Sequence, residues 1–218
     1  MKKILTACLL ALSCLGAAAQ EDSIYGIPTD VYYLMPSFGK GMVYFSGQAP
    51  AQGQLNICAV DNTLRFKDKK GQEIVAENTD NVVKVVIDNV SFIRSDGMFY
   101  RMYPVTLDYG IALRRDVRII KDAKQGGYGT TSRTSSTREY STIYADGVLY
   151  GLDKSENYPY EVSEFILLYR GDNVVPLNKK NLRKLFPDKK TEIDEYFKSG
   201  GTLPQTLDGT LELLGRWK

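Results

Sequence analysis

The chain contains no histidine among its 218 residues. Histidine is the commonest general base near neutral pH and the commonest metal ligand, so its absence excludes Ser-His and Cys-His catalytic pairs and histidine-containing zinc sites. Long hydrophobic runs are also scarce. The run at the N-terminus, Ile4 to Leu15, has 12 residues, fewer than the roughly 20 that a membrane-spanning helix needs. No other run reaches membrane length, so no transmembrane segment is expected in the mature chain.

An excess of one charge sign is missing as well. The chain has 28 lysines and arginines against 26 aspartates and glutamates, and Lys2 and Lys3 are the only charged residues before Glu21. Removing these two lysines leaves 26 basic against 26 acidic side chains. A neutral chain lacks the basic footprint of a nucleic-acid-binding protein, so no nucleic-acid partner is expected. Its 43% hydrophobic and 25% charged residues indicate a folded globular protein.

The N-terminus has the pattern of a secretory signal peptide. Lys2 and Lys3 supply the positive start, the apolar run follows, and small residues end at Ala19 before Gln20. We therefore expect residues 1–19 to be a signal peptide cleaved between Ala19 and Gln20, which gives a periplasmic or secreted protein. The alternative is a lipoprotein, since residues 11–14 resemble a lipoprotein box that would place a lipid anchor on Cys14.

Cysteine is almost absent from the expected mature chain. Cleavage after Ala19 removes Cys8 and Cys14, so Cys58 remains alone and no intramolecular disulfide can form. Cys58 lies in a strand-like apolar run, where a free cysteine usually behaves as a small buried hydrophobic residue. With no histidine to activate it, catalysis by Cys58 is not expected.

The body of the chain reads as a series of hairpins. Short apolar, β-branched and aromatic runs alternate with turns that contain glycine, which is typical of antiparallel strands. An Asp-Gly pair suits such turns because both residues tolerate the left-handed region of backbone conformation. Four candidate hairpins have their turns at residues 68–71, 95–97, 145–147 and 170–173. The run Val82 to Ile87 is apolar on both faces and predicts a core strand.

The pattern changes after Pro176. Asn178 is a candidate cap for a short helix that ends near Phe186, Pro187 suits the first turn of a second helix, and a third is expected from Asp208 to Trp217. Short helices are marginal in water, so we expect them to pack on the sheet. The predicted fold class is α+β: an antiparallel β-rich body at residues 20–175, a barrel or a sandwich, with a C-terminal helical appendage at residues 176–218.

The segment from Gln125 to Thr137 is rich in glycine, serine and threonine. Such a composition cannot build a core, and the simplest interpretation is a loop that connects two strands. The alternative is a recognition loop, in which Tyr128, Arg133 and the following Arg138 are the candidate binding residues. The glycine spacing matches neither a phosphate loop nor a dinucleotide fingerprint, so no nucleotide cofactor is expected.

A series of features in chain order resembles uncharacterised exported proteins of Bacteroidota. It comprises Leu64-Arg65-Phe66, the run Val82 to Ile87, the stretch Asp96 to Arg101, the glycine-rich stretch 127–132 and the segment Lys180 to Lys190. The Ala19-Gln20 junction is also similar to signal ends in that group. The resemblance covers most of the mature chain. It implies an exported protein and brings no established activity or catalytic residues.

Carboxylates offer the chain's remaining candidate chemistry. A glycoside hydrolase uses two carboxylates that flank one bond, and Glu73, Glu77 and Asp80 are candidates because they lie between two strands. Hard oxygen ligands for calcium occur at residues 61–62 and 77–81, but neither stretch has the spacing of a calcium loop. The basic residues at 114–124 are interrupted by two aspartates, which is typical of a solvated strand face. No catalytic residue, metal ligand or cofactor is predicted.

These observations favour a non-enzymatic binding or interaction protein of the cell envelope. Its expected partner is another envelope protein or a glycan. The alternatives are a carbohydrate-active hydrolase and a passive glycan-binding module. The 15 tyrosines all follow the signal segment, and an exposed row of tyrosine rings would favour the glycan-binding module, whereas tyrosines that pack in the sheet would not.

Overall fold

The computed structural model describes residues 23–121, 139–140, 144–145, 148–149 and 152–217. Among these residues eleven strands form one antiparallel sheet, and ten of them follow one another in the order β15-β14-β10-β9-β8-β7-β3-β4-β5-β6. This confirms the predicted α+β class with an antiparallel body. The outermost strands, β15 and β6, do not pair with each other. The sheet is therefore open, so the barrel, one of the two forms expected for the body, is wrong.

The strands of the first half are short, except β4. Their bounds are β3 Gly39–Phe45, β4 Gln48–Ile57, β5 Leu64–Lys67, β6 Glu73–Val75, β7 Val82–Ile87, β8 Val90–Ser95 and β9 Met98–Pro104. A two-residue turn joins β7 to β8, and another joins β8 to β9, with positive φ at all four turn residues (Asp88 and Asn89, Asp96 and Gly97). Such turns match the right-handed twist of a hairpin. The hairpins β5-β6 and β8-β9 confirm two of the predicted pairings.

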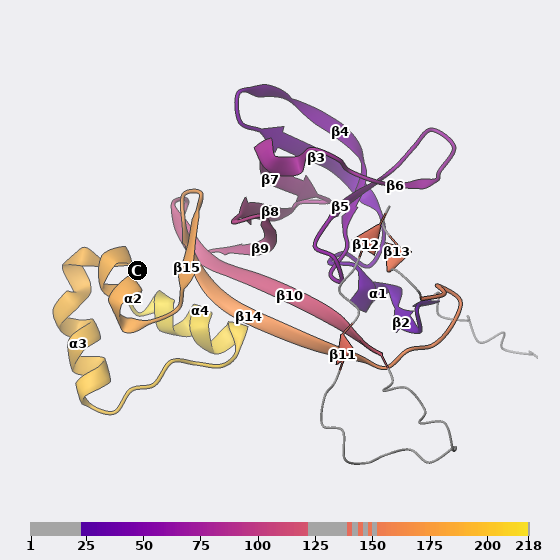
Figure 1. Cartoon of the computed structure of the whole chain (residues 1–218). Helices are drawn as coiled ribbons and strands as arrows, with labels where there is room; N and C mark the ends of the chain where they lie inside the picture. The colour runs from indigo at the N-terminus through magenta and orange to yellow at the C-terminus, as the bar shows by residue number, and fades with distance from the viewer. Residues whose placement is uncertain (1–22, 122–138, 141–143, 146–147, 150–151, 218) are drawn as a thin grey trace, which may run out of the picture.

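The first half of the sheet curls on itself (Figure 1), and an apolar core lies within it. This core contains Val43 of β3, Leu55 of β4, Val85 of β7 and Phe92 of β8, all buried. Strand β7 lies between β3 and β8. Val82, Val85 and Ile87 are buried in this core, whereas Val83, Lys84 and Val86 are only partly buried, so the apolar run forms a central strand that is covered mainly on one face.

Two long strands form the second half. Strand β10 (Tyr109–Lys121) pairs with β14 (Tyr160–Arg170) over eleven residue pairs, and β15 (Asn173–Pro176) returns along the end of β14. This β14-β15 hairpin confirms a third predicted pairing. The fourth prediction falls on β12 (Tyr144–Ala145) and β13 (Val148–Leu149), which pair with each other. Strand β11 (Glu139–Tyr140) pairs with the end of β10.

Different elements cover the two ends of the β10-β14 ribbon (Figure 1). One end packs against the N-terminal elements β1 (Ser23–Ile24), β2 (Ile27–Pro28) and α1 (Thr29–Tyr32). The other end packs against the C-terminal helices through a second large core that includes Ile111, Leu168, Leu182 and Trp217. The middle of the ribbon lies between these two covered ends.

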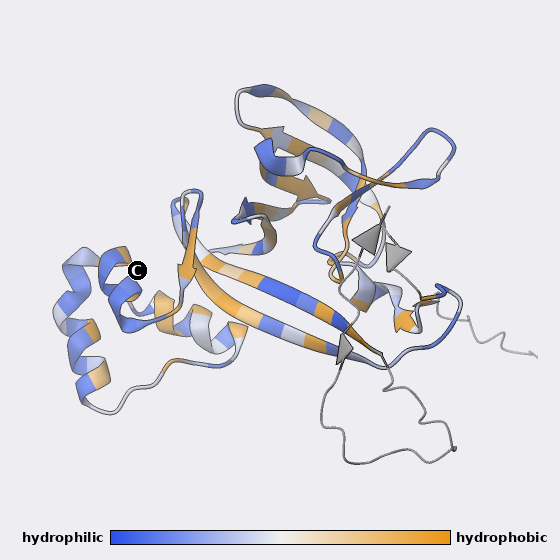
Figure 2. Ribbon diagram, in the orientation of Figure 1, coloured by the Kyte–Doolittle hydropathy of each residue, from blue (hydrophilic) through white to orange (hydrophobic). Residues whose placement is uncertain are grey.

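The C-terminal helices are α2 (Lys179–Leu185), η2 (Pro187–Lys189), α3 (Lys190–Lys198) and α4 (Leu207–Gly215). The side chain of Asn178 accepts a hydrogen bond from the backbone N–H of Asn181 at 2.8 Å, which confirms the predicted cap. Figure 2 shows mostly hydrophilic residues along α2 and α3, and hydrophobic stretches where β10 and β14 approach α4. Within the described residues, none of the helices combines the length and apolarity required to cross a bilayer.

Candidate functional site

Several sites expected from the sequence lie outside the described residues. These are the loop residues Tyr128, Arg133 and Arg138, the cleavage site at Ala19 and Gln20, and Cys14. The candidate site described below comes instead from the pairing of β14, which the sequence did not single out.

Strand β14 is paired along its whole length on one side only. Its inner side runs against β10 from Tyr160 to Arg170. Its outer side pairs with β15 from Leu167 to Arg170. In the part of the chain that the structure describes, no strand pairs with the outer side of residues 160–166.

The hydrogen-bond pattern shows which peptide groups point outward there. The backbone N–H of Ile120 donates to the carbonyl of Pro159 at 2.8 Å. In an antiparallel pair the two groups of one residue point to the same side, and successive residues alternate. Ser163 and Phe165 therefore face β10, whereas Val162 and Glu164 direct their N–H and C=O groups to the outer side. A row of such groups is a template for pairing with another extended chain.

Two apolar side chains flank this open edge. Val162 is 46% exposed and Phe165 is 39% exposed. The guanidinium of Arg114 lies 4.5 Å from the centre of the Phe165 ring, and the carboxylate of Glu164 binds Arg115 at 3.0 Å. These contacts hold Phe165 and Glu164 in place on opposite faces of the strand.

A depression of about 420 Å³ lies where the open edge meets the end of β15. Its apolar walls come from β14, from the end of β15 and the residue after it, and from the segment before α4: Phe165, Ile166, Leu167, Pro176, Leu177, Leu203 and Pro204. A strand added to β14 would run toward this depression. The depression could then hold one apolar side chain of that strand.

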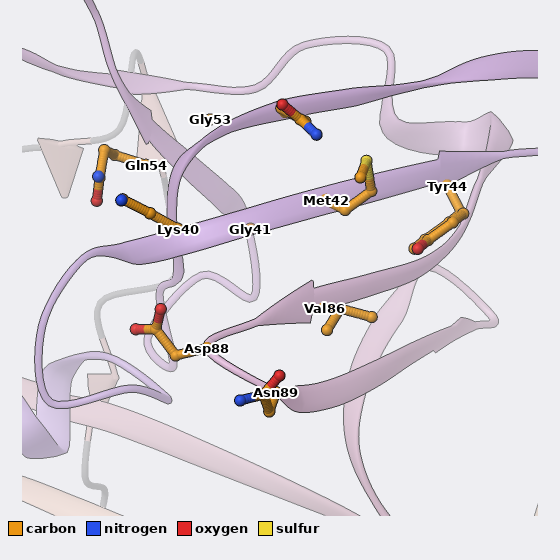
Figure 3. A pocket seen from close by; sticks show the side chains of 10 residues that line it. Lys40, Gly41, Met42, Tyr44, Gly53, Gln54, Val86, Asp88 and Asn89 are labelled. Atoms are coloured by element: carbon orange, nitrogen blue, oxygen red, sulfur yellow. The ribbon is translucent and has the colours of Figure 1, made fainter.

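A second depression, of about 740 Å³, lies over β3, β4 and β7 (Figure 3). Polar side chains from two strands and a turn surround it: Lys40, Gln52, Gln54, Asp88 and Asn89. The ring of Tyr44, 38% exposed, lies at one end, and Met42 lies beside it (Figure 3). The arrangement offers amide and carboxylate groups for hydrogen bonds and one aromatic ring for stacking.

A cluster of polar and charged residues is buried between the N-terminal segment and the sheet. Arg65 of β5 forms an ion pair with Asp61 and lies 3.6 Å from the carboxylate of Glu73. The hydroxyl of Tyr33 donates to that carboxylate at 2.6 Å. Burial raises the pKa of the neighbouring Cys58 thiol to about 12 and that of Tyr33 well above its ordinary value. The thiol is therefore protonated at neutral pH. The contacts of the cluster join the N-terminal segment to β5 and β6.

The acids considered for hydrolysis lie in different settings. The Glu73 carboxylate faces Tyr33 and Arg65. The Asp80 side chain, 96% exposed in η1 (Thr79–Asn81), faces Arg94 of β8 at 3.4 Å. Glu73 and Asp80 therefore each face a different arginine, Arg65 and Arg94.

The calcium candidates are engaged elsewhere. Asp61 accepts hydrogen bonds from Thr63 and pairs with Arg65, and the side-chain oxygen of Asn62 accepts from the backbone N–H of Phe99 at 2.6 Å. Across the ranges that the structure describes, no group of three or more cysteine, aspartate or glutamate residues could hold a metal ion.

Comparison of the chain with protein-family models, with curated proteins and with solved structures finds no match.

Proposed function

We propose that the protein is an exported, non-enzymatic binding protein of the cell envelope, and that the outer edge of β14 pairs with an extended segment of another envelope protein. The open edge at residues 160–166 carries the proposal, because its outward peptide groups can form a strand ladder. Export is supported by the signal pattern before Gln20 and by the resemblance to exported proteins of Bacteroidota.

The edge favours a particular kind of segment. Main-chain hydrogen bonds to Val162 and Glu164 would give affinity without regard to sequence, and side chains would give specificity. An apolar side chain fits the depression beside Phe165 and Leu177. An acidic residue opposite Glu164 would be repelled, because like charges directly opposite each other destabilise a strand pair.

Photo-crosslinking in the native envelope tests this proposal. Benzoylphenylalanine replaces Phe165 on the edge or, as a matched control, Tyr44 on a central strand; the two side chains are 39% and 38% exposed. We expect a discrete protein adduct from position 165 that maps to an extended segment of the partner, and no such adduct from position 44. Equal adducts from both positions, or none from position 165, would contradict the proposal.

A proline variant separates strand addition from simple proximity. Val162→Pro removes one outward N–H, and proline is tolerated on an edge whose N–H faces away from the sheet. It should abolish the adduct from position 165, whereas Val162→Thr, which keeps the N–H and the branched shape, should retain it. An adduct that survives Val162→Pro would show that main-chain pairing is not involved.

The location is tested by the mass and N-terminal sequence of the protein recovered from soluble and membrane fractions. A soluble chain that starts at Gln20 supports a periplasmic or secreted protein. An acylated chain that starts at Cys14 in the membrane fraction would make the protein a lipoprotein and contradict cleavage after Ala19.

A passive glycan-binding module is the second candidate, and the depression in Figure 3 favours it. Amide side chains and one exposed aromatic ring are the groups that sugar hydroxyls and ring faces contact. The protein should be retained on immobilised polysaccharides if this function is right. The double variant Tyr44→Ala with Gln54→Ala should lose retention, and the single variant Phe165→Ala should keep it. Equal retention of the two variants would exclude this depression as the glycan site.

A further inference from the structure

Positive charge is concentrated in one short segment of an otherwise balanced chain. Residues 179–190 include six basic side chains and one acidic side chain: Lys179, Lys180, Arg183, Lys184, Lys189 and Lys190 against Asp188. This segment forms α2, η2 and the start of α3. It lies at the far end of the molecule from α1 (Figure 1), and Figure 2 shows it as mostly hydrophilic.

The packing of α2 explains why the basic side chains share one surface. Leu182 and Leu185 are buried in the core beneath the helix. Because residues three and four apart lie on one helical face, the remaining positions point outward. Lys180, Arg183 and Lys184 are exposed there.

Five of the six basic side chains line a depression of about 560 Å³, together with Pro187. The five are Lys179, Lys180, Arg183, Lys184 and Lys190. We call this depression the cationic pocket. The concave shape directs several positive charges to one volume, where a compact anion could contact more than one of them.

Too few carboxylates neutralise this charge. Asp194 of α3 binds Lys179 at 2.7 Å and lies 3.8 Å from Arg183, and these cations lower its pKa. In the described parts of the chain, Lys180, Lys184 and Lys190 form no ion pair. Uncompensated like charges repel one another, and a bound anion relieves that repulsion.

We infer that the cationic pocket binds a phosphate group. Phosphate carries up to two negative charges on a compact set of acceptor oxygens, which suits several lysine ammonium groups around one arginine. Lysine supplies point charges to such a group, and the Arg183 guanidinium can donate two parallel hydrogen bonds. The phosphate could belong to a lipid headgroup or to a free ligand.

The test uses two phosphate probes on the purified protein. One is inorganic pyrophosphate, measured by calorimetry, and the other is phosphatidylcholine vesicles that contain phosphatidic acid, measured by cosedimentation. The test variant combines Lys180→Gln, Lys184→Gln and Lys190→Gln. The control combines Lys69→Gln, Lys70→Gln and Lys154→Gln, which removes the same charge from exposed lysines elsewhere.

We expect the test variant to bind roughly a hundredfold more weakly, since each lysine near an anionic surface contributes about a factor of five. The control should change the affinity by less than about threefold, because distant exposed charges are screened. Binding of vesicles alone assigns the phosphate to a lipid headgroup, and binding of pyrophosphate assigns it to a free group. Failure to bind either probe, equal losses in both variants, or equal affinity for citrate would overturn the inference.

Discussion

Arg65 carries a positive charge into the interior, where its side chain is only 2% exposed. It pairs there with Asp61, which is also buried, and with the half-exposed Glu73. Removing one partner of a buried pair leaves the other charge without compensation, which is costly. Because Glu73 also accepts from Tyr33, the stability of the N-terminal segment on the sheet depends on this pair.

Arg65→Met should therefore lower the free energy of unfolding by about 3 to 5 kcal/mol. Arg216→Met is the control, since Arg216 and Glu212 form an exposed pair one helical turn apart and such a pair contributes at most about 0.5 kcal/mol. Urea unfolding measures both variants. Similar small losses in the two would show that the buried cluster adds little to stability.

The Cys58 thiol gives the protein a pH dependence in the alkaline range. Its pKa rises from an ordinary value of 9.0 to about 12 because burial penalises the thiolate. A pKa that is higher in the folded state favours folding below the unfolded value, and this contribution is lost as pH rises from about 9 toward 12.

Between about pH 8 and about pH 10, wild type should lose roughly 1.4 kcal/mol more stability than Cys58→Ala. Urea unfolding of both proteins at the two pH values gives this difference directly, whatever the alanine itself costs. An equal loss in the two proteins would mean that the thiol titrates in the folded state as it does in the unfolded chain.

At the scale of elements, Gly110 lies where β9, β10 and β14 meet, opposite Pro104 and Tyr169. A methyl group there would come within 2.2 Å of the carbonyl oxygen of Tyr103, whereas at Gly53 of β4 the nearest atom would lie at 3.4 Å. Gly110→Ala should cost about 1 to 3 kcal/mol through overpacking, and Gly53→Ala should cost little. Thermal unfolding of the pair compares them, and equal midpoints would contradict the close approach.

The sequence predicted those helices and hairpins whose formation depends on residues close together in the chain. Asn178 before an apolar spacing predicted α2, and Asp96-Gly97 between two apolar runs predicted the β8-β9 hairpin. The boundaries were less accurate at α4, where Thr206 caps the helix and the expected start was Asp208. The open sheet could not be predicted, because closure depends on which distant strands become neighbours.

The candidate site was harder to predict for the same reason. The turn at residues 170–173 indicated a hairpin, but nothing local shows that β15 covers only the end of β14. The cationic pocket did have a signal, six basic residues among the twelve at 179–190. Only the burial of Leu182 and Leu185 shows that these charges gather on one surface.

At the scale of the whole molecule, the β10-β14 ribbon separates two proposed surfaces. The open edge runs from Tyr160, at the end near α1, to Ile166 near the middle of β14, and the other end of the ribbon lies beside the helices that carry the cationic pocket (Figure 1). Strand addition depends on main-chain hydrogen bonds, whereas phosphate binding depends on charge. Raising the salt concentration should therefore weaken only the second interaction strongly.

The central claim is that the outer edge of β14 is open and pairs with a partner. Amide hydrogen exchange within this one strand tests it most directly, because neighbouring residues serve as controls. In the free protein we expect fast exchange at Val162 and Glu164 and slow exchange at Ser163 and Phe165, which face β10. Addition of the crosslinked partner's segment should slow Val162 and Glu164. Slow exchange at these two amides in the free protein, or fast exchange that persists with the segment bound, would contradict the claim.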